Sequence, residues 1–236
     1  MPDADALLAL AERHLDAGRV RLVLVGGAPG TGKTTLAKGL AEERGWVLLR
    51  SDEARKQLAG LAATTRAVRP LDAGIYGPTM TALTYGELLH HTEQLLRRGE
   101  TVVLDATWAD AAWRDEARRV ADRNDAELVA IRCVAPVAVA VQRVATRLPV
   151  GGDASDATPE VARAVAERFS PWADATEVDT SGPADSALRA ASHLAAASSP
   201  PAKGDHPAHL QRLTGGLLPR CPTSLGPCRR APAGRQ

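Results

Sequence analysis

A glycine-rich segment near the N-terminus has the residue types and spacing that bind phosphate groups. Residues 27–34 have the sequence GAPGTGKT, which fits the Walker A pattern of a glycine, four further residues and then Gly-Lys-Ser/Thr. Glycines permit backbone conformations in which successive N–H groups point at one phosphate. Lys33 would reach the β- and γ-phosphates of a nucleoside triphosphate, and the Thr34 hydroxyl would ligate Mg²⁺. The predicted nucleotide-binding residues are Gly27, Ala28, Pro29, Gly30, Thr31, Gly32, Lys33, Thr34 and Thr35.

The context of this loop favours a phosphate site over a glycine-rich turn without a ligand. An apolar strand precedes the loop, and a helix with one apolar face begins at Lys33. The start of that helix adds unpaired N–H groups and the positive end of the helix dipole. A dinucleotide-binding pattern is excluded, because Thr35 stands where that pattern needs its third glycine.

A carboxylate follows a second apolar strand, at residues 101–104. In an open parallel sheet the carboxyl ends of the strands meet at the ligand-binding edge, so Asp105 would hold Mg²⁺ together with Thr34, directly or through water. The alternative is that Asp105 only helps to start the following helix, a role for which Thr107 and Asp110 compete. The metal role is favoured.

A third polar segment, residues 50–56, has the sequence RSDEARK and would lie beside the phosphate loop. Asp52 could accept a proton from an acceptor hydroxyl, and Arg55 could hold the acceptor or the migrating phosphoryl group. A helix start explains the acids without chemistry, with Ser51 as N-cap and with Asp52 and Glu53 at the positive end of the dipole. The local spacing leaves both interpretations open.

Two arginines, Arg143 and Arg147, stand four residues apart on a predicted helix and therefore share a face. A stretch rich in small residues follows at 149–156, and residues 158–160 start another helix as N-cap, N1 and N2. A helix, a hinge and a helix with paired arginines suit a lid that closes over a triphosphate and excludes water. Two solvated arginines in an arginine-rich chain are the alternative.

Apolar strands alternate with helices along the chain, which predicts an α/β fold whose parallel sheet is covered on both faces. The predicted strands are 21–25, 46–49, 101–105, 127–133 and 176–179. The predicted helices are 3–17, 33–44, 53–60, 78–98, 110–123, 136–147 and 159–168.

Five segments resemble, in order, the P-loop kinase group that contains polynucleotide 5′-hydroxyl kinases, zeta toxins and gluconate kinases. They are residues 27–34, 51–56, 102–107, the pair 143 and 147, and 155–157. Within that group the likeness is greatest to a bacterial ATP-binding kinase-like domain often joined to an aminoglycoside-phosphotransferase-like domain, and it covers about residues 20–182. The resemblance implies a three-layer α/β/α P-loop NTPase fold, with a five-stranded parallel sheet ordered 2-3-1-4-5 and a helical lid.

The resemblance also implies roles for individual residues. Asp52 is the implied general base, Arg55 a contact to acceptor or phosphate, Asp105 a residue near metal and acceptor, and Arg143 and Arg147 the lid arginines. ATP and Mg²⁺ are the implied cofactors, and an alcohol group is the implied phosphoryl acceptor. Only about 20 residues precede the loop, so we expect that any coupling to a phosphotransferase-like domain is lost or is supplied by a partner protein in trans.

Composition divides the chain near residue 197. Residues 197–236 hold seven of the 16 prolines, six basic residues against one acid, and no aromatic residue. This composition predicts a disordered, basic tail, which we interpret as an unselected extension rather than a nucleic-acid-binding arm. The rest of the chain, residues 1–196, contains 23 Lys and Arg against 27 Asp and Glu, which gives a net charge of −4. The predicted parts are an N-terminal helix at 1–19, a kinase-like domain at 20–196 and the tail at 197–236.

The charge and composition of the chain also restrict the classes of partner that it is expected to bind. The acidic core and the seven aromatic residues give little of the basic funnel and stacking platform that a polynucleotide acceptor needs. The acidic N-terminus is not that of a signal peptide, no apolar run is long enough to cross a membrane, and three cysteines form no disulfide framework. We therefore expect a cytoplasmic protein without a membrane partner.

These patterns together predict an ATP-binding kinase that transfers the γ-phosphoryl group to a hydroxyl of a small-molecule acceptor. A polynucleotide 5′-hydroxyl kinase is one alternative. A nucleotide-binding regulatory module without its own acceptor is the other. Trp108 and Trp113 follow Asp105 and could line an acceptor pocket, although core packing is expected for at least one of them.

Overall fold

The computed structural model describes residues 4–65, 72, 74–150 and 154–196. Within them, five strands form one sheet in the order β2-β3-β1-β4-β5, and every pair of neighbours is parallel. The order 2-3-1-4-5 that the resemblance implied is confirmed. The strands are β1 (Arg21–Gly26), β2 (Val47–Arg50), β3 (Val102–Asp105), β4 (Glu127–Val134) and β5 (Thr176–Asp179).

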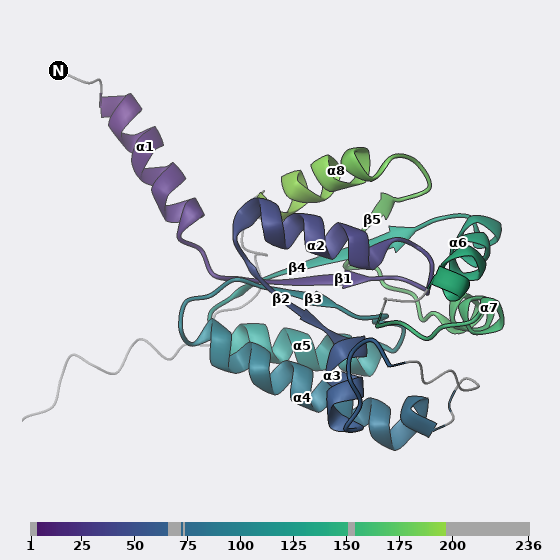
Figure 1. The fold of residues 1–236 in the computed structure, drawn as a ribbon. Helices are drawn as coiled ribbons and strands as arrows, with labels where there is room; N and C mark the ends of the chain where they lie inside the picture. Colours follow the sequence, from purple (N-terminus) through teal and green to yellow (C-terminus); the bar gives the residue numbers. More distant parts are fainter. Residues whose placement is uncertain (1–3, 66–71, 73, 151–153, 197–236) are drawn as a thin grey trace, which may run out of the picture. The chain divides into compact units, whose positions relative to one another are not determined.

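Helices cover both faces of the sheet, as Figure 1 shows: α2 and α8 lie on one face, and α4 and α5 lie on the other. Helices α6 and α7 lie side by side near the carboxyl ends of the strands. The helices are α1 (Ala4–Ala17), α2 (Lys33–Arg44), α3 (Ser51–Leu58), the short 3₁₀ helix η1 (Gly74–Tyr76), α4 (Pro78–Leu96), α5 (Ala111–Arg123), α6 (Val137–Val150), α7 (Pro159–Arg168) and α8 (Ala184–Ala196).

The central strand β1 shows why this arrangement forms. All six of its residues are buried, and because side chains alternate along a strand, its two faces join different cores. Leu22 and Leu24 pack with α4 and α5, whereas Val23 and Val25 pack with α2 and α8. A strand that is buried on both faces needs a continuous apolar sequence, which β1 has.

The predicted α/β fold class is confirmed, and the predicted elements match those observed to within a few residues. Two predictions differ from the structure. Helix α3 begins at Ser51, two residues earlier than predicted, and its N-cap is Arg50, so the interpretation of Ser51 as the N-cap was wrong. Helix α8 was not predicted, because the face that it buries consists of small residues, including Ala187, Ala191 and Ala195, which give a weak hydrophobic pattern. The predicted tail at 197–236 lies outside the described residues.

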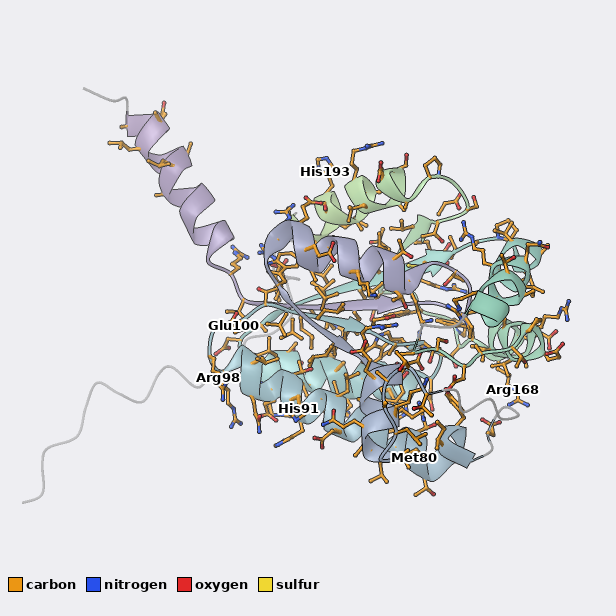
Figure 2. All side chains as sticks on the ribbon, viewed as in Figure 1. Met80, His91, Arg98, Glu100, Arg168 and His193 are labelled. Carbon is orange, nitrogen blue, oxygen red and sulfur yellow. The ribbon has the colours of Figure 1, made fainter. Side chains whose placement is uncertain are left out.

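No helix among the described residues is long and apolar enough to span a membrane. His90 and His91, adjacent on α4, are surface residues that contact Gln94 and Glu87 respectively on the same helix. Figure 2 shows the His91 side chain projecting from α4.

Candidate active site

The glycine-rich loop joins β1 to α2 in a conformation that only glycine adopts easily. Gly30 and Gly32 both have a φ of +85°, in the left-handed region that disfavours other residues. A Cβ atom at Gly30 would also overlap the carbonyl oxygen of Ala140 in α6. No side chain caps α2 at Gly32, so the first N–H groups of the helix are left for an anion.

Thr34 and Asp105 meet directly beside this loop. The Thr34 hydroxyl donates a hydrogen bond of 2.7 Å to Oδ2 of Asp105, although 71 residues separate them in sequence. Asp105 is 4% exposed, and its Oδ1 is buried without a hydrogen-bond partner among the described residues. A hydroxyl and a carboxylate with a free oxygen are ligands that Mg²⁺ prefers, so this pair fits the predicted metal role.

The competing interpretation of Asp105, as a helix-start residue, is wrong. Asp110 is the N-cap of α5 and accepts a 2.9 Å hydrogen bond from the N–H of Ala112. No cluster of three or more His, Cys, Asp or Glu side chains in the described part of the chain could hold a metal ion. A cation bound at Asp105 would therefore complete its coordination with phosphate oxygens and water.

Arg50 is a site residue to which the sequence analysis gave no role. The β2–β3 register places it directly opposite Asp105, and its Nε lies 3.2 Å from Oδ2 of that carboxylate. Its Nη1 lies 2.6 Å from Oε1 of Glu53. Arg50 is 7% exposed, so its charge acts on Asp105 with little screening by water. Its position at the last residue of a strand paired with β3 is the signal that could have revealed it.

Replacing Arg50 with methionine should destabilise the protein in the absence of Mg²⁺ and make it depend on the cation. The change leaves the buried Asp105 carboxylate without its counter-charge, which costs about 3–5 kcal/mol. Mg²⁺ with a non-hydrolysable ATP analogue should restore part of that loss. Thermal unfolding with and without Mg²⁺ measures the effect, and a larger Mg²⁺-induced shift than in the wild type is expected.

Arg118→Met is the matched control for this experiment. Arg118 pairs with Asp174 at 2.7 Å, but both side chains are about half exposed or more, and such pairs contribute about 1 kcal/mol or less. An equal Mg²⁺-induced shift in Arg50→Met and in the wild type would show that Arg50 does not act on the metal site.

A cavity of about 440 Å³ opens beside the phosphate loop. Pro29 and Lys33 line it at the loop, and Asp52 and Arg55 line it from α3. Further walls come from α4, α5, α7 and the segment before α7. The structure thus brings together four of the predicted site residues. Arg143 and Arg147 are not among the residues that line this cavity.

Asp52 is the second residue of α3 and lies half-buried in the cavity wall. Its charge reaches the neighbouring Tyr76 side chain. Burial raises the pKa of Tyr76, and the carboxylates of Asp52 and Asp156 raise it further. The Tyr76 hydroxyl is therefore protonated at neutral pH and donates a 2.9 Å hydrogen bond to Asp156.

Arg55 is held rigidly in the same wall. Its Nη1 donates to the carbonyl of Ile75 at 2.9 Å and to the hydroxyl of Thr81 at 3.2 Å. The guanidinium lies 5.0 Å from the centre of the Tyr76 ring, a cation–π distance. Its Nε is buried with no hydrogen-bond partner among the described residues, so Arg55 keeps bonding capacity that this structure does not use.

A buried ion pair, also missed by the sequence analysis, supports the wall from behind. Lys56 is fully buried, and its Nζ lies 3.3 Å from Oδ2 of Asp156 and 3.0 Å from the Ala63 carbonyl. Asp156 is 100 residues away in sequence, so the pair fixes α3 against the segment that leads into α7. The chain has only four lysines, and the use of lysine here, in place of arginine, was the available signal.

The two predicted lid arginines lie on α6, near the other flank of the loop. Nη2 of Arg143 donates to the Thr180 carbonyl at 2.8 Å and to the Ser181 carbonyl at 3.3 Å. Nη1 of Arg143 would lie 3.7 Å from a Cβ atom at Gly32. The hydroxyl of Thr180 in turn bonds to the Thr31 carbonyl. Arg143 is therefore next to the loop, while the lid role of Arg143 and Arg147 stays a prediction.

Cys133 lies under the loop, and its carbonyl oxygen would be 2.7 Å from a Cβ atom at Gly27. Burial raises the pKa of its thiol to about 12, against a smaller lowering by Lys33. At pH 8 only about one thiol in ten thousand is then ionised. In a variant with Cys221→Ser and Cys228→Ser, Cys133 should resist thiol reagents until the protein is denatured. Rapid labelling of the folded variant would contradict this.

Comparison with known proteins gives matches of three kinds. A family described as AAA domain matches residues 22–172. The Mycobacterium tuberculosis (strain ATCC 25618 / H37Rv) protein Rv2004c is 39% identical over 192 residues, which cover 81% of this chain and 38% of that protein. This chain therefore spans about two fifths of the length of the curated relatives that it matches.

Solved structures share the fold. The Mycobacterium tuberculosis APS kinase CysC, in complex with AMPPNP and APS, aligns with a TM-score of 0.55 at 19% identity, over 75% of this chain and 97% of its own. A gluconokinase from Sinorhizobium meliloti 1021 aligns with a TM-score of 0.51 at 17% identity, over 75% and 91%. At these identities the alignments show a P-loop kinase-like fold, and the narrower grouping and the joined domain stay predictions.

Proposed function

Because the chain belongs to the AAA domain family, with a P-loop kinase-like fold, we propose that it is an ATP-dependent kinase acting on a hydroxyl of a small molecule. One observation carries the proposal: a single cavity joins Lys33 of the phosphate loop to the carboxylate of Asp52. A module that only sensed nucleotide would need the loop but not a second wall with a half-buried carboxylate and a guanidinium.

The nucleotide would be held by the loop and α2. The N–H groups at the start of α2 and the Lys33 ammonium stabilise the negative charge of the phosphates. Thr34 and Asp105 are the residues that would hold Mg²⁺, which neutralises charge on the β- and γ-phosphates when it is bound. Arg50, whose Nε lies 3.2 Å from the Asp105 carboxylate, would hold that carboxylate in place for this purpose.

The acceptor would bind between Asp52 and Arg55. The Asp52 carboxylate accepts the proton of the acceptor hydroxyl as its oxygen forms a bond to the γ-phosphorus. The bond between that phosphorus and the oxygen bridging to the β-phosphate breaks, and ADP leaves with the electron pair. Arg55 orients the acceptor, and Arg143 and Arg147 would add positive charge near the transferring group.

A partner in trans remains part of the proposal. The relatives extend well beyond the region that this chain matches. A separate protein that resembles the unmatched region of those relatives could supply the small molecule or receive its phosphorylated product. Size-exclusion chromatography of this chain mixed with such a protein would test the idea.

A metabolite extract incubated with the protein, ATP and Mg²⁺ tests the kinase activity. We expect one compound to gain the mass of a phosphoryl group while an equal amount of ADP forms. Release of inorganic phosphate without a phosphorylated product would contradict the proposal. Nucleotide-dependent association with another protein, with no transfer, would favour the regulatory alternative.

A further inference from the structure

The acceptor wall contains an aromatic platform that the proposed phosphoryl transfer does not itself require. Trp113 of α5 and Tyr85 of α4 are stacked, with ring centres 5.0 Å apart and planes 12° from parallel. Tyr85 is 4% exposed and Trp113 is half-buried, and both line the cavity. The stack covers one side of the Trp113 ring, and Trp113 still forms part of the cavity wall.

A third ring makes this platform rigid. Trp108 is fully buried and meets Tyr85 edge to face, with ring centres 5.2 Å apart. Its backbone N–H donates to the Tyr85 hydroxyl at 3.2 Å. Trp108 has a φ of +52°, a conformation that costs energy for a bulky residue and persists only where the surroundings impose it. Trp113 is therefore presented on a fixed support.

Aliphatic side chains complete the apolar part of the cavity. Val161 and Val165 stand four residues apart on α7, on one face of the helix, and both line the cavity. Ala109 and Ala157 also line it. A ligand that was polar all round, such as an open-chain polyol, would lose hydration against these groups without gaining hydrogen bonds.

The charges that line the cavity limit the charge of the acceptor. Of the cationic residues, Arg168 is already paired with Asp72 at 2.8 Å, and Lys33 is committed to the nucleotide in the proposed function. Of these three cations, Arg55 is the one that can bind an acidic group of the acceptor. No carboxylate forms an ion pair with Arg55 among the described contacts. The carboxylates of Asp52 and Asp110 also line the cavity, so a ligand with several negative charges would be repelled.

We propose that the acceptor is a small hydroxylated aromatic molecule with at most one acidic group, whose ring packs on Trp113 and whose acidic group binds Arg55. The buried Nε of Arg55, which has no partner among the described residues, supports a ligand contact there. The proposal rests on the proposed kinase function, since it takes Asp52 and the phosphate loop as the place of the reacting hydroxyl. The proposal excludes polynucleotides and sugar phosphates as acceptors at this site.

Four probes that differ in one property each test the proposal. They are 4-(hydroxymethyl)benzoate, benzyl alcohol, 4-(hydroxymethyl)phenyl phosphate and gluconate. Binding to the full chain with Mg²⁺ and AMPPNP is measured by ligand-observed NMR titration. We expect 4-(hydroxymethyl)benzoate to bind at least about tenfold more tightly than gluconate, since ring contact and stacking are both lost in the polyol. The doubly charged phosphate should bind more weakly than the benzoate.

Variants assign the contacts. Trp113→Leu should weaken benzoate binding about tenfold, and Trp113→Phe, which keeps a ring, should restore most of it. Arg55→Met should weaken binding of the benzoate but not of benzyl alcohol. Trp46→Leu is the control, because Trp46 packs in the core on the opposite face of the sheet. AMPPNP affinity should be unchanged in all four variants.

The possible outcomes separate this proposal from the kinase proposal. Equal or tighter binding of gluconate or of the aryl phosphate, no binding of either uncharged or singly charged aromatic probe, or an unchanged affinity in Trp113→Leu would each overturn the acceptor class. Binding as expected without any phosphoryl transfer in the extract assay would leave the acceptor class standing and overturn the kinase function.

Discussion

Replacing Lys33 with alanine should reduce phosphoryl transfer by about a thousandfold. Lys33 is the first residue of α2 and is 8% exposed, and it lines the cavity at the end where the triphosphate would lie. Its ammonium would follow the charge that develops on the transferring group, in a place where little water screens it. Single-turnover assays with γ-labelled ATP measure the rate, and a fluorescent ATP analogue measures affinity.

Lys38→Ala is the control on the same helix. Lys38 lies on the exposed face of α2. The Lys38→Ala change removes the same positive charge and introduces the same residue into the same helix as Lys33→Ala does. Transfer at the wild-type rate in Lys33→Ala would show that the loop does not hold a reacting phosphate. A similar loss in Lys38→Ala would point to a general effect of charge.

The second large effect is expected for Asp52→Asn. Loss of the proton-accepting carboxylate should lower kcat by about 10²–10⁴-fold, while the affinity for ATP stays within about twofold, since Asp52 is on the acceptor side of the cavity. The asparagine keeps the size and polarity of the side chain, so the fold should be retained. Steady-state kinetics with the acceptor identified by the extract screen give both quantities.

Glu53→Gln distinguishes catalysis from helix stabilisation. Glu53 is the next residue of α3 and also lies in its first turn, so both carboxylates interact with the same helix dipole. Glu53 also pairs with Arg50, and the glutamine keeps an oxygen that can accept the hydrogen bond from that guanidinium. If Asp52 only stabilises the helix, the two variants should each lose about 0.3–1 kcal/mol of stability and both keep their activity. A kcat for Asp52→Asn close to that of Glu53→Gln would show that Asp52 is not the base.

The phosphate loop could be predicted from sequence because its function depends on local backbone geometry. Gly30 and Gly32 supply left-handed conformations within eight consecutive residues, and the strand before them and the helix after them are strongly patterned. Asp105 was predictable for a related reason. It ends a buried strand, and in a parallel sheet all strand ends meet at one edge, so its contact with Thr34 follows from topology.

The cavity beside the phosphate loop could not be predicted in the same way, because its walls come from segments far apart in sequence. Trp113 and Tyr76 belong to different helices, and which of their atoms face the cavity depends on helix packing. The end position of Arg50 in β2 places it at the ligand-binding edge, but its pairing with Asp105 depends on the register of β2 against β3, which a four-residue strand does not reveal. The Lys56–Asp156 pair forms across 100 residues, with no local pattern to indicate it.

The two ion pairs at the cavity differ in the energy that their separation requires. Lys56 and the Asp156 side chain are almost entirely shielded from water, so parting them would leave unpaired buried charges at a cost of about 3–5 kcal/mol. Asp72 and Arg168, the latter visible at the end of α7 in Figure 2, are each more than half exposed. Their separation costs about 1 kcal/mol or less.

This difference makes one side of the cavity easier to loosen than the other. Thermal fluctuations would part Asp72 from Arg168 about a hundredfold more often than they part Lys56 from Asp156. The Lys56 side of the cavity therefore serves as a fixed anchor, and the Asp72–Arg168 pair is the first of the two to break. Salt, which screens the exposed pair but hardly affects the buried one, would weaken the Asp72–Arg168 pair without loosening the wall that holds Arg55.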